Sequence, residues 1–315
     1  MVDVSVIIVN RNTKKKLYDC LKSIFEQSSN CSIEVIVVDN ASQDDSQFMV
    51  KNEFPIITLI ENSQNLGFAR ANNIGIKAAS GRYVALVNSD VVVLKDCIEK
   101  LISSMDENSD VGIAGPKILN ADNSLQPSCG RFPSLWNNFC QAVGLEIVFP
   151  MSSFFGDWTM KYWAHDSLRR VDVLNGCFWM VRRKALEEVG LLDERFFMYG
   201  EDLDWCRRFH DAGWDVCFYP DAQAIHYGGA SSATAPIRFY LEMQRADLQY
   251  WEKHHGRLKQ VCYGLIILLR HLIRVVLFAI IYLVHPQSRS RTRFKLRRSI
   301  ACIQWLLRLR TIESE

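Results

Sequence analysis

Short apolar runs alternate with longer polar or amphipathic stretches over the first third of the chain. The apolar runs are rich in β-branched residues and only a few residues long, which is typical of buried strands. The four runs are Val4–Val9, Glu34–Asp39, Ile57–Glu61 and Tyr83–Asn88. A helix-compatible stretch follows each of them, and this alternation predicts a mostly parallel sheet with helices on both faces.

Capping residues indicate where the helices between these strands begin and end. Thr13 and Ser42 are the expected N-caps of the first two helices, because a hydroxyl accepts hydrogen bonds from the free N–H groups of a first turn. The next helix is expected to run from near Phe68 to Ser80-Gly81, since glycine is favoured just after a helix C-terminus.

The pattern changes after about residue 110. The expected strands are Val111–Leu119, Val171–Val181 and Val216–Tyr219, and the expected helices are Lys184–Val189, Glu201–Ala212 and Ile237–Lys253. A stretch rich in Trp and Phe, Phe132–Trp163, separates the first two of these strands. Because no linker rich in Pro, Gly or Ser divides the halves, we expect one domain over residues 1–256, with halves 1–110 and 111–256.

The net charge of +2 conceals an uneven distribution. Residues 257–315 carry 12 Lys and Arg against 2 acids, a net charge of +10, which leaves −8 on the preceding 256 residues. The acidic part argues against a nucleic-acid-binding domain, because such domains concentrate Lys and Arg on one face. Two regions with different partners are therefore expected.

The ten cysteines form no CxxC pair and are scattered through apolar runs. This spacing favours buried free thiols in a reducing compartment over a disulfide framework or a zinc site. Met1 leads within three residues into a strand, without the basic and apolar regions of a signal peptide. We therefore expect the main domain to stay in the cytoplasm.

The apolar run Val261–Val284 is nearly long enough to cross a bilayer. Arg270, His271 and Arg274 interrupt it near the middle, where a charge costs about 2.5–3.5 kcal/mol. Arg270 and Arg274 are four residues apart and share one helical face, so we expect a helix that lies in the membrane interface rather than one that spans it.

Basic residues continue beyond Pro286, and a second apolar and basic segment follows at Ile300–Arg310. The basic residues are Arg289, Arg291, Arg293, Lys295, Arg297 and Arg298. Each is attracted to anionic lipid by about 1 kcal/mol near the surface. Residues 257–315 are thus expected to be a membrane-associating tail, and a helical hairpin that packs on a partner subunit is the alternative.

Polar side chains follow the first strands where those strands end. They are Asn10-Arg11-Asn12, Asp39-Asn40-Ala41-Ser42 and Asn88-Ser89-Asp90. Open α/β sheets bind ligands at the carboxyl ends of their strands, so these groups are candidates for a site, although Asp39-Asn40 alone fits an Asx-turn and Asn88-Ser89-Asp90 an ordinary turn.

Three further segments carry candidate chemistry. They are Asn62 to Asn73 with Asn65, Gly67, Arg70 and Asn72, then Tyr199 to Cys206 with Glu201-Asp202, and His226 before Gly228-Gly229 and Ser231-Ser232. Gly67 permits close backbone approach at a helix start, and Arg70 is placed to meet phosphate oxygens. A capped helix explains the apolar residues of the first segment but not its polar ones, and a cluster of caps is the alternative for the second.

The sequences of these segments and their order along the chain resemble those of the family 2 inverting glycosyltransferases of the GT-A fold, particularly their rhamnosyltransferase-like members. The matching segments are VIIVNRN, VIVVDNAS, NLGFARANN, LVNSD, YGEDLDWC and HYGG, and the resemblance covers about residues 4–256. It implies an α/β, Rossmann-like GT-A domain with a mostly parallel central sheet flanked by helices, and membrane-associating helices follow at the C-terminus.

The resemblance also implies roles for individual residues. Asp202 is the implied base that deprotonates the acceptor hydroxyl, Glu201 supports the acceptor sugar or orients the site, and Asp204 is structural. The implied nucleotide-sugar site comprises Asn10, Asp39, Asn65, Gly67, Arg70, Asn72, Ser89 and Asp90. The implied acceptor residues are Gly176, Trp179 and Trp205, where core packing of the aromatics is an equally good interpretation.

A divalent cation, Mg²⁺ or Mn²⁺, is expected beside Asp90. Asn88-Ser89-Asp90 resembles the family's DxD motif with Asn in the first position, and Mg²⁺ needs only one or two carboxylates besides phosphate oxygens and waters. His226 completes the shell in this interpretation, because His is an accepted ligand of Mn²⁺. A lone His beside a glycine-rich turn is otherwise usually structural.

The expected function is inverting sugar transfer, from dTDP-rhamnose as first choice or from a UDP-sugar. The expected acceptor is a polyprenyl-diphosphate-linked glycan in cell-envelope polysaccharide synthesis of the O-antigen or capsule type, at the cytoplasmic face of the inner membrane. An anionic membrane surface is the further partner, no nucleic acid is expected, and a homo-oligomer stays open. The alternatives are an inactive sugar-nucleotide-binding subunit and a nucleotidyltransferase, but Asn10-Arg11-Asn12-Thr13 is not the glycine-rich phosphate loop that the latter needs.

Overall fold

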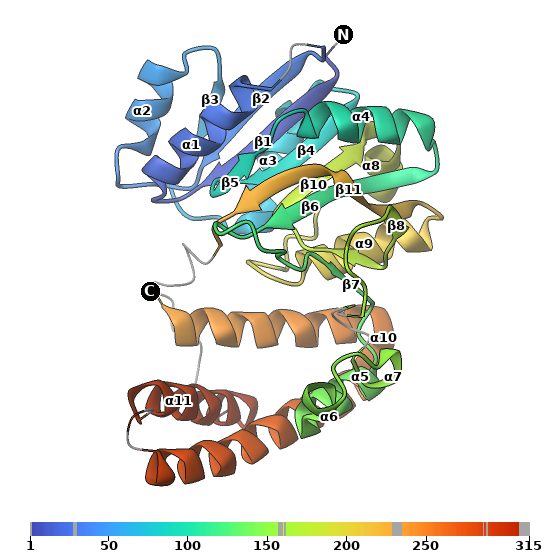
Figure 1. The fold of residues 1–315 in the computed structure, drawn as a ribbon. Helices are drawn as coiled ribbons and strands as arrows, with labels where there is room; N and C mark the ends of the chain where they lie inside the picture. The colour runs from blue at the N-terminus through green and yellow to red at the C-terminus, as the bar shows by residue number, and fades with distance from the viewer. Residues whose placement is uncertain are drawn as a thin grey trace. The chain divides into compact units, whose positions relative to one another are not determined.

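The computed structural model describes residues 2–27, 30–156, 160, 162–228, 235–285, 287 and 289–308. The chain divides into two compact units, which are described separately (Figure 1). The sheet unit comprises residues 1–132 and 163–231, and the helical unit comprises residues 133–162 and 232–315. The predicted boundary after residue 256 differs from this division, which groups residues 232–256 with the helices that follow them.

Nine strands of the described residues form the central sheet, in the order β3-β2-β1-β4-β10-β6-β11-β5 with β8 beside β11. They are β1 (Val4–Asn10), β2 (Ile33–Asp39), β3 (Thr58–Glu61), β4 (Tyr83–Asn88), β5 (Val91–Val93), β6 (Val111–Leu119), β8 (Arg169–Arg170), β10 (Phe178–Arg182) and β11 (Asp215–His226). The strands β7 (Cys129–Gly130) and β9 (Val173–Leu174) pair separately.

Strands β3, β2, β1 and β4 run parallel, and β6 pairs in parallel with β11. Strand β10 lies antiparallel between β4 and β6. Asn10 is level with Asp39, and Val9 with Asn88, so the carboxyl ends of β1, β2 and β4 meet at one edge. The predicted α/β class is confirmed, and this edge is where the polar triplets lie.

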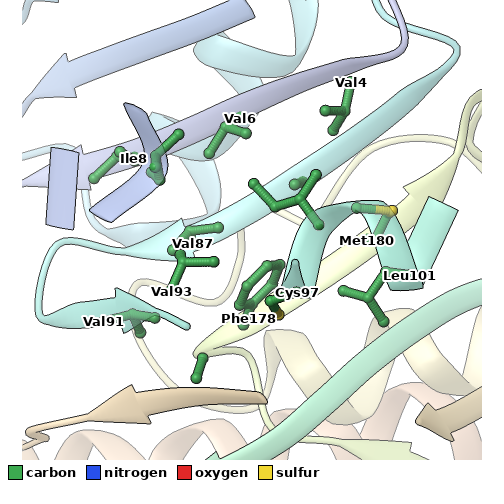
Figure 2. Packing of buried hydrophobic residues seen from close by; sticks show 14 of the residues in the cluster. Val4, Val6, Ile8, Val87, Val91, Val93, Cys97, Leu101, Phe178 and Met180 are labelled. Atoms are coloured by element: carbon green, nitrogen blue, oxygen red, sulfur yellow. The ribbon is translucent and has the colours of Figure 1, made fainter. Parts of the chain in front are cut away.

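Helices cover both faces of the sheet, as the alternation predicted. They are α1 (Lys14–Phe25), α2 (Ser46–Glu53), α3 (Phe68–Ala78), α4 (Cys97–Glu107), α8 (Arg183–Val189) and α9 (Glu201–Asp211). Successive side chains of a strand point to opposite faces. Val4, Val6 and Ile8 of β1 therefore belong to the core cluster that includes residues of α4 (Figure 2), whereas Ile7 meets Gly75 of α3.

Three local expectations were wrong. Ser42 does not cap α2, whose N-cap is Asp45, because its hydroxyl accepts from Asn10 and from the backbone N–H of Asn12. Helix α3 ends at Ala78, so Gly81 lies beyond its C-cap; a Cβ on Gly81 would meet the backbone nitrogen of Ser5 at 2.6 Å. The expected strand Val171–Val181 is broken into β9 and β10.

The helical unit contains α5 (Leu135–Val143), α6 (Leu145–Val148), α7 (Ser153–Gly156), α10 (Pro236–Val284) and α11 (Arg289–Leu306). Helix α10 breaks at Gly256, whose φ of 79° and ψ of 167° are not helical. We call residues 236–255 its first arm and residues 257–284 its second arm. The two arms fold back on each other, as two contacts between them show. The rings of Trp251 and Tyr263 stack with centroids 5.3 Å apart, and the Tyr263 hydroxyl donates to Asp247 at 3.0 Å.

The second arm is apolar outside and polar inside. Among the described residues, α10 is the one helix long and apolar enough to cross a membrane, by length and composition. Arg270 is only 7% exposed and His271 is fully buried, so Arg270 does not lie on an outer, interfacial face as expected. They lie inside because they pack toward the first arm, where Tyr240 contacts His271.

Candidate active site

A hydrogen-bonded group of polar side chains joins the ends of β1 and β2. Asn10 donates to Asp39 at 2.9 Å and to Ser42 at 3.1 Å. Asp39, 1% exposed, also accepts from the backbone N–H of Ser42 and from the side chain of Gln47. The predicted residues Asn10 and Asp39 are therefore hydrogen-bonded to each other. Ser42 is part of the same hydrogen-bonded group and does not cap a helix.

Thr13 connects this group to the end of β4. Its hydroxyl donates to the Asn10 side chain at 2.6 Å and lies 2.8 Å from the Ser89 hydroxyl. Thr13 occupies the N-cap position of α1, but its side chain makes no capping hydrogen bond there. The three predicted residues Asn10, Asp39 and Ser89 thus lie in one connected network.

Asp90 and His226 meet at the far end of that network. His226 Nε2 lies 3.3 Å from Asp90 Oδ1, and Lys16 Nζ lies 3.7 Å from Asp90 Oδ2. Burial opposes ionisation of Asp90, but the hydrogen bond and charge of His226, with the charge of Lys16, outweigh it and hold the pKa of Asp90 below its ordinary value. Asp90 is therefore an anion at neutral pH.

Gln126 fixes the orientation of His226. Its Oε1 lies 2.7 Å from His226 Nδ1, and its Nε2 donates to the His226 carbonyl at 3.1 Å. Because Oε1 can only accept, Nδ1 carries a proton, and Nε2 is the ring nitrogen that faces Asp90 and that would bind a cation there. The tautomer with its proton on Nδ1 is the one that a metal ligand requires here.

The segment after β3 joins the site through Asn40. Asn40 donates to the Asn65 side chain at 3.2 Å and to the Gly67 carbonyl at 3.0 Å, and its backbone N–H donates to the Asn10 carbonyl. Gly67 has φ of 82°, and a Cβ there would lie 2.5 Å from the Phe197 carbonyl. The glycine is therefore required by contact with the protein's own backbone.

Arg70 and Asn72 lie on α3 but make other contacts. Arg70 Nε is 3.8 Å from Glu194, and its side chain is 58% exposed. Asn72 is 1% exposed and donates to the Phe68 carbonyl one turn earlier. Arg70 is free to reach a ligand by rotation, whereas the Asn72 amide is engaged by its own helix, which does not support its predicted contact with the nucleotide.

Glu201 and Asp202 are neighbouring carboxyl groups in the first turn of α9. Burial and the charge of Asp202 raise the pKa of Glu201 well above its ordinary value. Burial also raises the pKa of Asp202, but backbone N–H groups of Leu203, Gly200 and Gly176 stabilise its anion. The pKa of Glu201 is thus raised well above its ordinary value, and its Oε2 is buried without a hydrogen-bond partner.

Cys177 lies near both Asp90 and Asp202. Burial raises the pKa of its thiol to about 12, and the charges of Asp90 and Asp202 add to that rise. The backbone confirms the proximity, because the N–H of Asn88 donates to the Cys177 carbonyl at 2.9 Å. The charges of Asp90, which follows β4, and of Asp202 on α9 thus both act on one residue in the loop before β10.

The aromatic residues expected at the acceptor site are buried, which agrees with core packing, the alternative interpretation of these side chains. Trp179 and Trp205 are both 0% exposed and pack with ring centroids 5.5 Å apart. Their indole nitrogens donate to the carbonyls of Leu174 and Gly190. Gly176 is required by this packing, since a Cβ there would lie 3.1 Å from the Trp179 ring.

Asp204 has the structural role predicted for it. It is fully buried and accepts from Arg208 Nε at 2.9 Å, while Arg208 also donates to the carbonyls of Val189 and Leu191. The predicted residues Gly229, Ser231 and Ser232 lie outside the described residues.

Asp90 and His226 fit a cation whose remaining coordination positions are filled by a bound ligand. The described residues contain no group of three or more His, Cys, Asp and Glu side chains that could enclose a metal ion. A carboxylate oxygen and an imidazole nitrogen 3.3 Å apart supply two ligands, which suits Mg²⁺ or Mn²⁺ held also by phosphate oxygens.

Sequence reasoning missed Lys16, Gln126 and Cys177. Lys16 ends the run Lys14-Lys15-Lys16 after the first strand, and that run of cations beside a phosphate-type site was the available signal. Gln126 and Cys177 lie in loops without a recognisable pattern, so only the folded chain brings them to Asp90.

Comparison with known proteins identifies a matching family, similar chains and a similar fold. The model of the family described as Glycosyl transferase family 2 matches residues 5–190. An N-acetylglucosaminyl-diphospho-decaprenol L-rhamnosyltransferase of Mycobacterium tuberculosis is 31% identical over 218 residues, covering 65% of this chain and 69% of that protein. The dTDP-rhamnosyl transferase RfbF of Shigella flexneri is 25% identical, covering 80% and 81%.

A solved structure with a similar fold is that of GalNAc-T7 with UDP, GalNAc and Mn²⁺. Its TM-score is 0.56 at 15% identity, and the match covers 80% of this chain and 50% of that one. The chain therefore spans about half the length of GalNAc-T7, and the likeness concerns the fold.

Proposed function

The chain belongs to glycosyl transferase family 2, and from this premise we propose that it transfers a sugar from a nucleotide donor to an acceptor hydroxyl with inversion. The observation that carries the proposal is that Asp90, which pairs with His226, and Asp202 both lie close enough to Cys177 for their charges to act on its thiol. The Asp90–His226 pair is suited to holding the diphosphate through a cation, and Asp202 is suited to accepting a proton. This reaction requires both.

The nucleotide sugar lies along the carboxyl edge of β1, β2 and β4 in this proposal. Asp39, held by Asn10 and Gln47, faces the base and ribose, and Ser89 lies beside the phosphates. Arg70 reaches the diphosphate by leaving Glu194, because a guanidinium pairs more strongly with a phosphate than with an exposed carboxylate 3.8 Å away.

Asp90 and His226 would hold the divalent cation. When bound, the cation neutralises charge on the departing diphosphate. The chain's own contribution is to orient both ligands: Gln126 sets the His226 tautomer, and Lys16 keeps Asp90 ionised. Mg²⁺ and Mn²⁺ both suit this donor set.

Asp202 acts as the base that takes the proton of the attacking hydroxyl. The backbone N–H of Leu203 donates to its carboxylate at 2.9 Å, and its raised pKa brings its basicity closer to neutral pH. Burial and the charge of Asp202 raise the pKa of Glu201, and in its protonated form Glu201 can donate a hydrogen bond to the acceptor sugar. No protein nucleophile is required for inversion.

dTDP-rhamnose is the proposed donor, with UDP-sugars as the alternative. Two relatives named for rhamnosyl transfer support it, one of them named for dTDP-rhamnose. The proposed acceptor is a polyprenyl-diphosphate-linked glycan of the cell envelope, because the mycobacterial relative is named for such a substrate. The long apolar helix α10 supports work at the membrane surface, and we place the enzyme peripherally at the cytoplasmic face.

A donor screen tests the proposal. The full-length protein is incubated with dTDP-rhamnose, UDP-sugars and GDP-sugars, with Mn²⁺, Mg²⁺ or a chelator, and release of nucleoside diphosphate is measured. Turnover of one donor that the chelator abolishes is the expected result. Turnover that the chelator leaves intact would contradict the metal assignment, and no turnover with any donor would favour an inactive binding subunit.

A further inference from the structure

Three arginines gather inside the helical unit without an acidic partner among the described residues. Arg270 and Arg274 lie on the second arm of α10, and Arg298 lies on α11. All three act electrostatically on His271, which is fully buried. We call Arg270, His271, Arg274 and Arg298 the arginine cluster.

The arginine cluster converges on one tyrosine of the first arm. The Tyr240 hydroxyl lies 3.1 Å from His271 Nε2, the Arg298 guanidinium lies over the Tyr240 ring at 4.4 Å, and Tyr240 raises the pKa of Arg274 against the effect of burial. Arg274 and Arg298 are half-buried, whereas Arg270 is only 7% exposed. The cluster is therefore closed at Arg270 and open at Arg274 and Arg298.

Several donors of the cluster have no partner. Nε and Nη2 of Arg270 and Nε of Arg298 are buried and make no hydrogen bond. An uncompensated buried charge costs several kcal/mol, and a guanidinium cannot escape that cost by losing its proton. The buried Arg208 of the sheet unit differs, since it pairs with Asp204 and two carbonyls. What the cluster lacks is an anion.

The exterior of the same arm indicates where that anion comes from. Eight of its exposed apolar residues recur every three or four positions and form one stripe along the helix, which Ile273, Leu277 and Val284 widen. The eight are Leu258, Val261, Leu265, Leu269, Leu272, Val276, Ile280 and Leu283. Leucines outside and arginines inside reverse the arrangement that water favours and match a helix that contacts hydrocarbon.

We propose that the arginine cluster binds the phosphate or diphosphate group of a membrane lipid. Guanidinium groups match phosphate oxygens in pairs, and the apolar stripe accounts for the acyl or polyprenyl chain. The phosphate belongs either to a phospholipid headgroup or to a polyprenyl diphosphate, which share this chemistry. The inference rests on the proposed membrane association, but its test measures binding and not transfer.

Two matched double variants of the full-length protein test the proposal. Arg274→Gln/Arg298→Gln removes two charges from the cluster, and Arg293→Gln/Arg297→Gln removes two exposed charges from the same helical hairpin. Binding is measured to phosphatidylcholine vesicles that contain phosphatidylserine, phosphatidic acid or a polyprenyl diphosphate at equal surface charge.

The cluster variant is expected to lose about tenfold or more in affinity for the phosphatidic acid or polyprenyl diphosphate vesicles relative to the control variant, because two charge-assisted hydrogen bonds are lost. Preference for polyprenyl diphosphate assigns the site to that lipid, and equal binding to phosphatidic acid assigns it to any exposed phosphate. Equal losses in both variants, or no loss in either, would overturn the proposal.

Arg270→Met gives a second and independent measurement. Because it removes a buried charge without a partner, it is expected to raise Tm by a few degrees without lipid and to abolish the Tm rise that short-chain phosphatidic acid gives the parent protein. Donor hydrolysis stays intact, so failure here is distinguishable from failure of the proposed reaction. A lower Tm in this variant would mean that Arg270 has a structural partner and no ligand.

Discussion

Nε2 of His226 lies 3.3 Å from Oδ1 of Asp90, although 135 residues separate them in the sequence. The two meet because His226 ends β11 level with Val91 of β5, the residue directly after Asp90. The tight connection from β4 to β5 thus carries Asp90 onto the edge of β11, and the sheet's own register builds the candidate metal pair.

Gln126→Leu is expected to weaken this pair without touching either ligand. Loss of the Oε1 contact frees the His226 ring to rotate and to change tautomer, and partners of this kind typically contribute about 10–100-fold to metal affinity or activity. Titration of donor binding with Mn²⁺ measures the change. Gln223→Leu, on the same strand as His226, serves as the control and should leave the titration unchanged.

Asp202→Asn is expected to reduce turnover by about 10²–10⁴ while donor affinity changes little, because only the basic group is removed. Asp211→Asn removes a charge from the same helix at a side chain that is 50% exposed, and it should keep normal turnover. Steady-state rates with saturating donor compare the two variants. Turnover of Asp202→Asn close to that of the control would remove Asp202 from the reaction.

Glu201→Gln should stabilise the fold at neutral pH. The pKa of Glu201 is raised in the folded state by burial and by Asp202, so between its unfolded and folded pKa the native state binds more protons than the unfolded state. The contribution of Glu201 to stability therefore falls as pH rises through that window, and it is greatest below the unfolded value of about 4.3.

The amide of the Glu201→Gln variant carries no charge at any pH, so this part of the pH dependence should disappear. Denaturant unfolding at several pH values between 4 and 8 measures it. A parent stability that rises across the whole range, with no gain in the variant at pH 7, would show that Glu201 is ionised in the fold.

The strands and the polar residues at their ends were predictable because the sequence patterns that indicate them are local. β-Branched runs and polar residues at their ends gave β1, β2 and β4 together with Asn10, Asp39 and Asp90. The contacts between these polar residues were not predictable. Ser42 is a good helix cap in isolation, but the parallel pairing of β1 and β2 places Asn10 within its reach, and that bond competes successfully with the cap.

The aromatic residues and the C-terminal helix show a second limit. A Trp after a glycine fits a sugar platform and a packed core equally well, and the burial of Trp179 depends on Trp205 from a distant helix. Helical spacing likewise placed Arg270 and Arg274 on one face, but it could not show that the chain folds back at Gly256 and turns Arg270 inward.

The outer stripe of the second arm carries the last prediction. Leu265 and Leu272 are 62% and 48% exposed, so Leu265→Glu/Leu272→Glu should change stability by less than about 1 kcal/mol. Vesicle binding should fall by at least about tenfold, since burial of each leucine contributes about 1.5–3 kcal/mol. Phe48→Glu/Ile56→Glu alters two side chains of the sheet unit that are 69% and 80% exposed, and it should leave vesicle binding unchanged.

The same pair of variants separates the membrane from a partner subunit. If the stripe packs on a second copy of the chain, Leu265→Glu/Leu272→Glu lowers the sedimenting mass of the detergent-free protein and leaves lipid binding as it was. If the stripe enters a bilayer, vesicle binding is lost, the sedimenting mass does not fall, and the residual binding of the variant becomes more sensitive to salt. That sensitivity follows because the exposed basic residues of α11 then supply most of the attraction, which salt screens over about 10 Å at 0.1 M.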